Sequence, residues 1–134
     1  MADLQFPGVR QYKDLSLTFA RNPVTNDVVA VTGEEAVKRS VKNLLYTMAG
    51  EVPFFPNFGS TLHALLFEPV DAITVISLED SIRTTLEAFE PRIRIVTLDI
   101  IPRPDELGYD VYLTIRLVNL PEPITLSVFL KRLR

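Results

Sequence analysis

The stretch "LEAFEPRIRIV", Leu86 to Val96, changes its hydrophobic period at Pro91. Before the proline, apolar residues recur at the three- and four-residue spacing of a helix, and after it isoleucines alternate with arginines, as on a half-buried strand. A proline also pushes the residue before it out of helical geometry, so a helix is expected to end there. The stretch therefore predicts a helix that turns directly into a strand.

Upstream of this joint, the sequence predicts two main helices and a short one. The longest covers about residues 71–89, and another follows Thr32. "STLHALLFE", residues 60–68, has the leucine spacing of a short third helix. Each main helix has one apolar stripe that predicts its buried face: Val37, Val41, Leu44 and Met48 in the first, and Val75, Leu78, Ile82, Leu86 and Phe89 in the second.

Downstream of the joint, apolar and polar residues alternate as in strands. We expect strands over residues 92–101, stopped by Pro102 and Pro104, then over 109–118 and 124–133. This order predicts a three-stranded antiparallel meander. In the last strand the inward positions are Ile124, Leu126, Val128 and Leu130.

Near the N-terminus, "LSLTF", residues 15–19, has strand-like alternation, and "VVAV", residues 28–31, is either its return strand or an extended lead into the first helix. The sequence thus predicts an α+β fold, with the two main helices and the short helix packed on a mainly antiparallel sheet of three to five strands. The chain's 134 residues suit one domain. We expect residues 1–14 to be an N-terminal extension and 15–134 a single small domain.

The segment "GEVPFFPNFGS", residues 50–60, combines helix-breaking prolines and glycines with Phe54, Phe55 and Phe58. Large aromatic rings favour burial. Such a loop is either pinned onto its own core or inserted into a partner, and the sequence leaves both interpretations open.

Composition excludes several classes of function. The formal net charge of −3 gives no broad attraction to nucleic acid or anionic lipid, and no apolar run is long enough to span a membrane. There is no cysteine, and His63 is the one histidine, so thiolate and multi-histidine metal sites are ruled out. No serine lies in a nucleophile elbow, no glycine-rich phosphate loop is present, and no carboxylate pair is singled out by spacing. We expect no enzymatic activity, no metal and no cofactor.

Glu90 and Arg92 place opposite charges on either side of Pro91. Three interpretations are open: the charges are catalytic, they hold the joint together as an internal ion pair, or they form a docking point for another protein.

Four segments occur in the order typical of one family: "RNPVTNDVV" (residues 21–29), "AVKRSVKNLLYTMAGEVPFFPNFGSTLHALLFE" (36–68), the long helix, and "FEPRIRI" (89–95). On these segments, over about residues 15 to 130, the chain resembles the GPW family of baseplate wedge proteins. These are also called sheath initiators, and they occur in contractile phage tails and related injection machines. One departure is Val52, which stands where the family has an arginine close after the glycine.

The resemblance implies a structural protein of the virion's tail baseplate, assembled in the host cytoplasm. It implies a sheet that accepts extended arms from tail sheath subunits, by strand addition. It also implies a contact between the Glu90-Pro91-Arg92 triplet and the helical core bundle of other wedge subunits, with the tail tube as a further candidate partner. The residues expected at these interfaces are Glu90, Pro91, Arg92, Ile124, Leu126, Val128 and Leu130.

Two alternatives accompany this interpretation. The last strand is the expected sheath template because no later strand in the chain covers it, and Leu15–Phe19 is its competitor. The alternative function is a lysozyme-like, peptidoglycan-degrading tail protein, which would need a sugar-binding cleft and a buried carboxylic acid of raised pKa.

Overall fold

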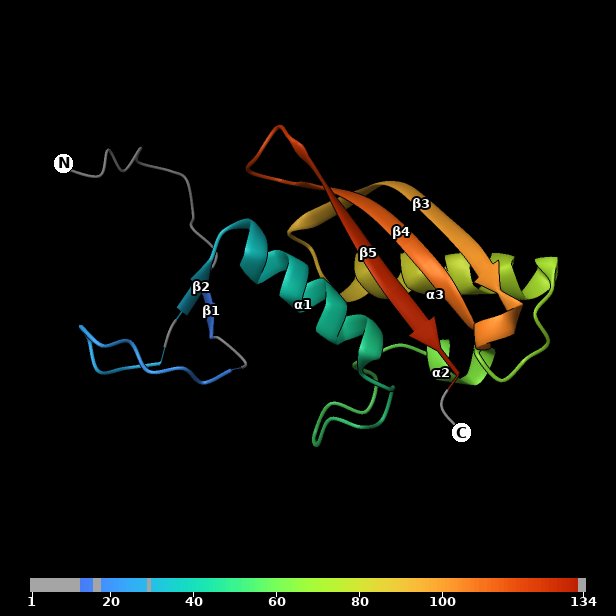
Figure 1. Cartoon of the computed structure of the whole chain (residues 1–134), viewed down its shortest axis with the longest axis horizontal. Helices are drawn as coiled ribbons and strands as arrows, with labels where there is room; N and C mark the ends of the chain where they lie inside the picture. Colours follow the sequence, from blue (N-terminus) through green and yellow to red (C-terminus); the bar gives the residue numbers. More distant parts are fainter. Residues whose placement is uncertain (1–12, 16–17, 29, 133–134) are drawn as a thin grey trace. The chain divides into compact units, whose positions relative to one another are not determined.

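The computed structural model describes residues 13–15, 18–28 and 30–132. Within them the chain divides after Ser40 into two compact units. The elements follow in the order β1 (Lys13–Leu15), β2 (Ala30–Thr32), α1 (Glu34–Tyr46), α2 (Leu62–Leu65), α3 (Ala72–Phe89), β3 (Ile93–Arg103), a 3₁₀ turn (Pro104–Glu106), β4 (Gly108–Leu117) and β5 (Pro123–Lys131) (Figure 1).

In the first unit, β1 and β2 form a two-stranded antiparallel ribbon. The turn between them is stabilised by Asn22, whose side-chain oxygen accepts the backbone N–H of Val24 at 2.9 Å, as turn-forming Asx residues do. Of the two interpretations left open for residues 28–31, the structure supports the return strand, since β2 pairs with β1. The predicted strand over residues 15–19 is wrong at its far end, since Thr18 lies in a turn and Phe19 has a φ of +49°. Residues 16 and 17 lie outside the described part of the chain.

The second unit is built on a three-stranded antiparallel sheet in the order β3-β4-β5, which confirms the predicted meander. Alternate residues of β4 face the core, and α3 lies behind the sheet (Figure 1). The predicted inward set of β5 is also confirmed, with three of the four side chains buried and Leu126 half-buried. The fold is α+β, as predicted. The buried residues of β4 are Tyr109, Val111, Leu113, Ile115 and Leu117.

Helix α3 has the bounds that the sequence predicts. Asp71 caps its start, because Oδ1 accepts the backbone N–H of Thr74 at 2.7 Å. These hydrogen bonds from Thr74 lower the pKa of the Asp71 carboxyl. At the other end, Pro91 prevents a further helical turn. Leu78, Ile82 and Leu86 are fully buried between these ends.

Strand β3 continues through Pro102 to Arg103, whereas the sequence predicted a stop at residue 101. Proline lacks a backbone donor and is tolerated on an edge strand, where one side of the backbone needs no ladder partner. β3 is such an edge, because within the described chain it pairs with β4 alone. The register also shifts between Ile95 and Thr97, which leaves Val96 as a bulge.

The aromatic loop between α1 and α2 is firmly attached at its base. The Ser60 hydroxyl, buried, donates to the carbonyl of Leu45 at 2.9 Å. Gly59 has a φ of +118°, and a Cβ there would lie 2.8 Å from the backbone of Met48, so the close approach requires glycine.

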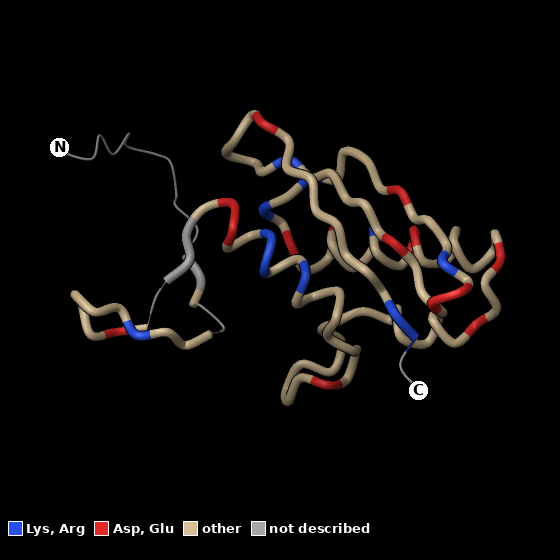
Figure 2. Tube along the Cα trace, viewed as in Figure 1, with Lys and Arg blue, Asp and Glu red and all other residues tan. Residues whose placement is uncertain are grey.

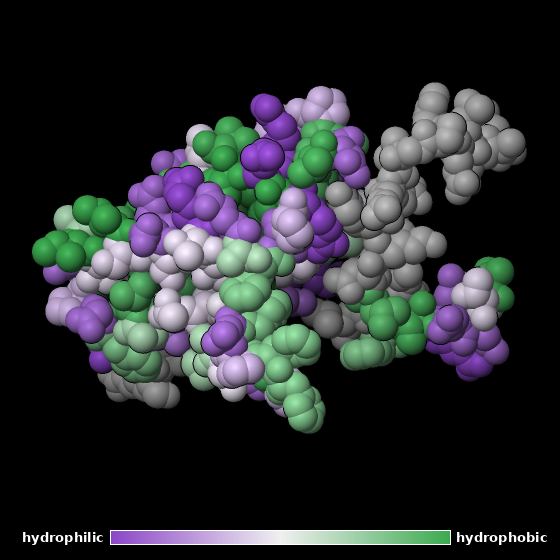
Figure 3. Space-filling view, turned by 180° about the vertical axis from the view of Figure 1, so that it is seen from behind, coloured by the Kyte–Doolittle hydropathy of each residue, from purple (hydrophilic) through white to green (hydrophobic). Residues whose placement is uncertain are grey.

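The three phenylalanines of this loop divide between the two interpretations that the sequence left open. Phe58 is pinned inside the unit, with its ring edge-on to that of Phe89 at a centroid distance of 5.1 Å. Phe54 and Phe55 are 97% and 68% exposed. Seen from behind, the loop forms the pale green projection at the lower edge of the molecule (Figure 3). Burial in the unit therefore accounts for one phenylalanine of the three.

Candidate functional site: a helix-to-strand joint and a sheet edge

The joint between α3 and β3 is closed by an ion pair across Pro91. Arg92 donates from Nε to Glu90 Oε1 at 2.5 Å and from Nη2 to Oε2 at 2.6 Å. The Glu90 side chain is only 4% exposed and that of Arg92 is 29% exposed. Bidentate contacts between charged groups are among the stronger hydrogen bonds in proteins. Of the three interpretations of these charges, the geometry supports an internal pair that holds the joint.

Backbone contacts explain why the two side chains meet. Glu90 ends α3, and its N–H still donates to the carbonyl of Leu86 at 2.9 Å. On the strand side, the N–H of Val118 donates to the carbonyl of Arg92 at 3.0 Å. The two charged residues are thus fixed by different elements, one by the helix and one by the sheet.

A shallow hollow of about 350 Å³ lies beside the joint. It offers a partner both apolar and acidic groups, with Arg94 at its rim. Its lining comprises Leu86, Glu87, Glu90, Pro91, Ile93, Arg94 and Ile95.

Within the described part of the chain β5 pairs with β4 alone, so its outer edge has backbone groups that the sheet does not use. The N–H of Arg132 donates to the carbonyl of Leu107 at 2.9 Å, and in an antiparallel ladder such bonded pairs recur at every second residue. Continuing this phase along the unbroken register, the backbone groups of Thr125, Ser127 and Phe129 point away from β4. The Tyr46 hydroxyl donates to the carbonyl of Phe129 at 3.0 Å, which agrees with that direction.

The four residues of β5 that were predicted to lie at an interface have side chains that point into the core. Ile124, Val128 and Leu130 have buried side chains, and Leu126 is half-buried. Their side chains belong to the core, so this strand can meet a partner through its outward backbone groups and through the side chains between them.

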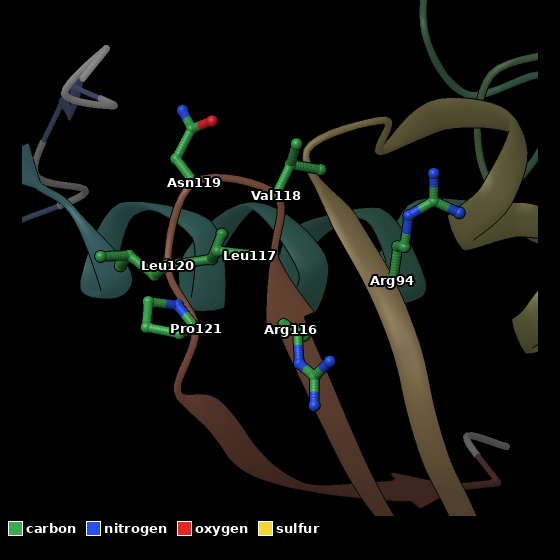
Figure 4. A pocket seen from close by; sticks show the side chains of 7 residues that line it. All are labelled: Arg94, Arg116, Leu117, Val118, Asn119, Leu120 and Pro121. Atoms are coloured by element: carbon green, nitrogen blue, oxygen red, sulfur yellow. The ribbon is translucent and has the colours of Figure 1, made fainter. Parts of the chain in front are cut away.

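The open face of the sheet carries two arginines that the sequence analysis did not single out. Arg94 on β3 and Arg116 on β4 are direct cross-strand partners. They line a hollow of about 450 Å³ at the β4–β5 turn (Figure 4). The alternating patterns "RIRIV" and "TIRLV" contain both residues. Their pairing depends on the register, which the patterns alone do not define.

Signs of enzymatic chemistry are few in the described part of the chain. No group of three or more metal-ligating side chains occurs there. His63 lines a cavity of about 220 Å³ that has no carboxylate in its lining. Among the described residues Glu90 is the buried acid, and both of its carboxylate oxygens accept hydrogen bonds from Arg92, whereas the general acid of a lysozyme must hold its proton.

Two further observations concern the distribution of charge and the character of the helices. Acidic and basic residues are interspersed along the second unit rather than gathered in one large field (Figure 2). Among the described residues, no helix has both the length and the apolar character needed to cross a membrane.

Comparison with known proteins found similarity to proteins of contractile baseplates. Baseplate wedge protein gp25 of Enterobacteria phage T4 is 30% identical over 98 residues, which covers 73% of this chain and 74% of that protein. A chain of the anti-feeding prophage baseplate has the same fold, with a TM-score of 0.72 at 22% identity, over 84% of this chain and 90% of that one.

A Geobacter sulfurreducens protein, known as a candidate tail lysozyme, is also similar. Its TM-score is 0.70 at 24% identity, over 75% of this chain and 92% of that one. At such identities the likeness shows a shared fold. The family model of baseplate wedge protein gp25 matches residues 31–119. The resemblance inferred from the sequence is thereby confirmed: the chain belongs to the GPW_gp25 family of baseplate wedge proteins.

Proposed function

We propose that this wedge-family chain templates the tail sheath by strand addition at the free edge of β5. It would join the core of the wedge to the sheath in the virion's tail baseplate, after assembly in the host cytoplasm. The observation that carries the proposal is the outward direction of the backbone groups of Thr125 and Ser127. An extended arm from a sheath subunit could pair with them, and its alternate side chains would fix the register.

The end of the strand fits an edge that waits for a partner. Unpaired edges promote self-association unless charged side chains guard them. Lys131 is exposed at the end of β5, and the Arg132 guanidinium lies 5.1 Å from the ring centroid of Phe67. These charges would discourage a second copy while leaving Thr125 and Ser127 accessible.

The joint supplies the second proposed contact, with the helical core bundle of other wedge subunits. The Glu90–Arg92 pair would act there by fixing the shape of the neighbouring hollow. The tail tube is a third proposed partner, to which no described residue is assigned.

A proline at position 127 tests the template. The Ser127 N–H points away from β4 and makes no hydrogen bond to that strand. Ser127→Pro should therefore leave the β4–β5 hydrogen bonds intact while removing one donor from the outer edge. We expect baseplates that contain the variant to form and sheath polymerisation on them to fail. Electron microscopy of assembled particles measures both.

Ser127→Ala is the matched control, because it alters the same side chain and retains the N–H; it should support normal sheaths. Circular dichroism of the purified proline variant establishes that it folds. Sheaths of normal length on Ser127→Pro baseplates would exclude β5 as the template and direct attention to the edge of β3 and to residues 15–19.

The lysozyme alternative has one observation in its favour, the name of the similar Geobacter sulfurreducens protein. The internal pairing of Glu90 argues against it. We therefore propose that the chain is not an enzyme. Clearing of a peptidoglycan suspension by the purified chain, lost on replacing one carboxylate, would overturn that proposal.

A further inference from the structure

Arg94 and Arg116 form a pair of like charges on the open face of the sheet. The Val118 N–H donates to the Arg92 carbonyl, so these two residues are a hydrogen-bonded pair of the β3–β4 ladder. Such pairs recur at every second residue, so Arg94 and Arg116 are also a hydrogen-bonded pair. The Cα atoms of such a pair lie about 5.5 Å apart. Like charges directly opposite each other destabilise a sheet. This arrangement therefore costs the isolated chain stability.

Neither guanidinium has a hydrogen-bond or ion-pair partner within the part of the chain that the structure describes. Both residues are exposed. Figure 4 shows the two head groups turned away from each other, Arg94 on the β3 side and Arg116 along β4.

The same face shows how the chain satisfies an arginine. Arg103 at the other end of β3 donates to Asp110 of β4 at 2.6 Å. Asp110 raises the pKa of Arg103 through this hydrogen bond and its charge. At positions 94 and 116 two arginines are direct cross-strand partners instead.

The rest of the hollow is mainly apolar. Val118 is 59% exposed and Leu120 is 38% exposed, and both line the hollow together with the two arginines. The full lining is Arg94, Arg116, Leu117, Val118, Asn119, Leu120 and Pro121.

We propose that this hollow, the arginine hollow, binds an acidic and partly apolar segment of a neighbouring baseplate protein. A carboxylate of that segment would bridge the two guanidiniums, with an apolar side chain over Val118 and Leu120. A guanidinium fork matches a carboxylate in geometry, and the contact would replace repulsion with attraction.

A protein segment fits better than nucleic acid. The cations in the lining number two, and the net charge of the chain is −3. Nucleic-acid binding relies on many phosphate contacts along a basic surface, whereas apolar walls suit the side chains of a protein. The lining of this hollow ends at Pro121, so it does not include Thr125 or Ser127, the backbone edge proposed for the sheath.

Cross-linking tests the proposal directly. Arg94→Lys and Arg116→Lys each keep the charge and provide an amine, which a carbodiimide joins to a carboxylate in contact. Assembled baseplates containing either variant should yield a cross-link from position 94 or 116 to an Asp or Glu of another subunit, identified by mass spectrometry.

Arg103→Lys is the matched control, on the same face but already paired in the chain. It should link to Asp110 of its own chain. Absence of any intersubunit link from positions 94 and 116, in baseplates where the control reaction succeeds, would overturn the proposal.

Neutralisation supplies a second, independent measurement. The double variant Arg94→Gln, Arg116→Gln should melt at the same temperature as the parent or higher, because the repulsion is gone. Its incorporation into baseplates should fall about tenfold, as expected when a paired interface charge loses its partner. Unchanged incorporation, or a lower melting temperature with a proportional loss of incorporation, would contradict the proposal.

Incorporation is scored before sheath is added. Failure of this inference is therefore distinguishable from failure of the proposed template at β5, which affects sheath growth on baseplates that have already formed.

Discussion

Two arginine–carboxylate pairs in this molecule have similar bond lengths and different surroundings. Glu90–Arg92 closes the joint between α3 and β3, with side chains 4% and 29% exposed. Arg103–Asp110 spans the β3–β4 hairpin, with side chains 54% and 21% exposed. The distance from the arginine Nε to the carboxylate oxygen is 2.5 Å in the first pair and 2.6 Å in the second. Burial and position, rather than the distance between the charged atoms, therefore determine how much each ion pair contributes to stability.

The two pairs differ in what remains when one partner is removed. A carboxylate left buried without its counter-charge loses hydration that nothing replaces. A partner that faces water is rehydrated, and surface pairs therefore contribute little. The first pair is therefore expected to stabilise the fold. The second is expected to add little stability to a hairpin that the β3–β4 ladder already holds together.

The largest effect is expected for Arg92→Ala. It leaves the Glu90 carboxylate buried at the joint, and we expect the free energy of unfolding to fall by about 2 kcal/mol, below the range for fully buried pairs because Arg92 is partly exposed. Urea denaturation of the purified chain measures this. A pair that served only an interface would leave stability within about 0.5 kcal/mol of the parent.

A double variant that removes both members of the pair is the control. Glu90→Leu combined with Arg92→Ala removes both charges, so the double variant should be more stable than Arg92→Ala alone. Additive losses from the two single changes would mean that the pair does not stabilise the joint.

An intermediate effect is expected for Asp71 at the other end of α3, where backbone N–H groups replace the guanidinium. Hydrogen bonds from Thr74 lower its pKa below the ordinary value of 3.8. A lowered pKa in the folded state stabilises the protein above the unfolded pKa, and this stability is lost as the pH falls through the folded value.

Asp71→Asn retains a capping oxygen that does not titrate. The variant should therefore lose less stability than the parent when the pH falls below about 4. Thermal melts at a series of pH values measure the difference. Parallel curves for parent and variant would show that Asp71 does not contribute to the acid sensitivity.

The smallest effect is expected for Arg103→Ala. Its side chain is 54% exposed, and the β3–β4 ladder that ends at this residue already holds the hairpin. We expect no shift of the melting temperature beyond experimental error. A loss as large as that of Arg92→Ala would remove the distinction between the two pairs.

The sequence predicted those parts of the fold in which one local signal determines the outcome. The predicted range of α3 agreed with the structure to within a residue, and its end was predicted from Pro91, because a proline acts on the backbone next to it. Alternation in β4 predicted its buried face, because one face of the strand is fully covered.

What the sequence did not predict depends on contacts between distant segments. The continuation of β3 through Pro102 required knowing that β3 is an edge, and the opposition of Arg94 to Arg116 required the register. The burial of Glu90 likewise results from tertiary packing, so the triplet alone left three interpretations open. Phe58 and Phe54 are both aromatic loop residues, and only the fold distinguishes the one that packs on Phe89.

We propose that the outer edge of β5 serves as the template for the sheath. The most direct measurement is a cryo-electron microscopy map of the baseplate carrying its first sheath ring. The account predicts an extended sheath segment beside β5, hydrogen-bonded to the backbone of Thr125 and Ser127 on the side away from β4. A map in which those groups face solvent while the sheath segment pairs elsewhere would contradict it.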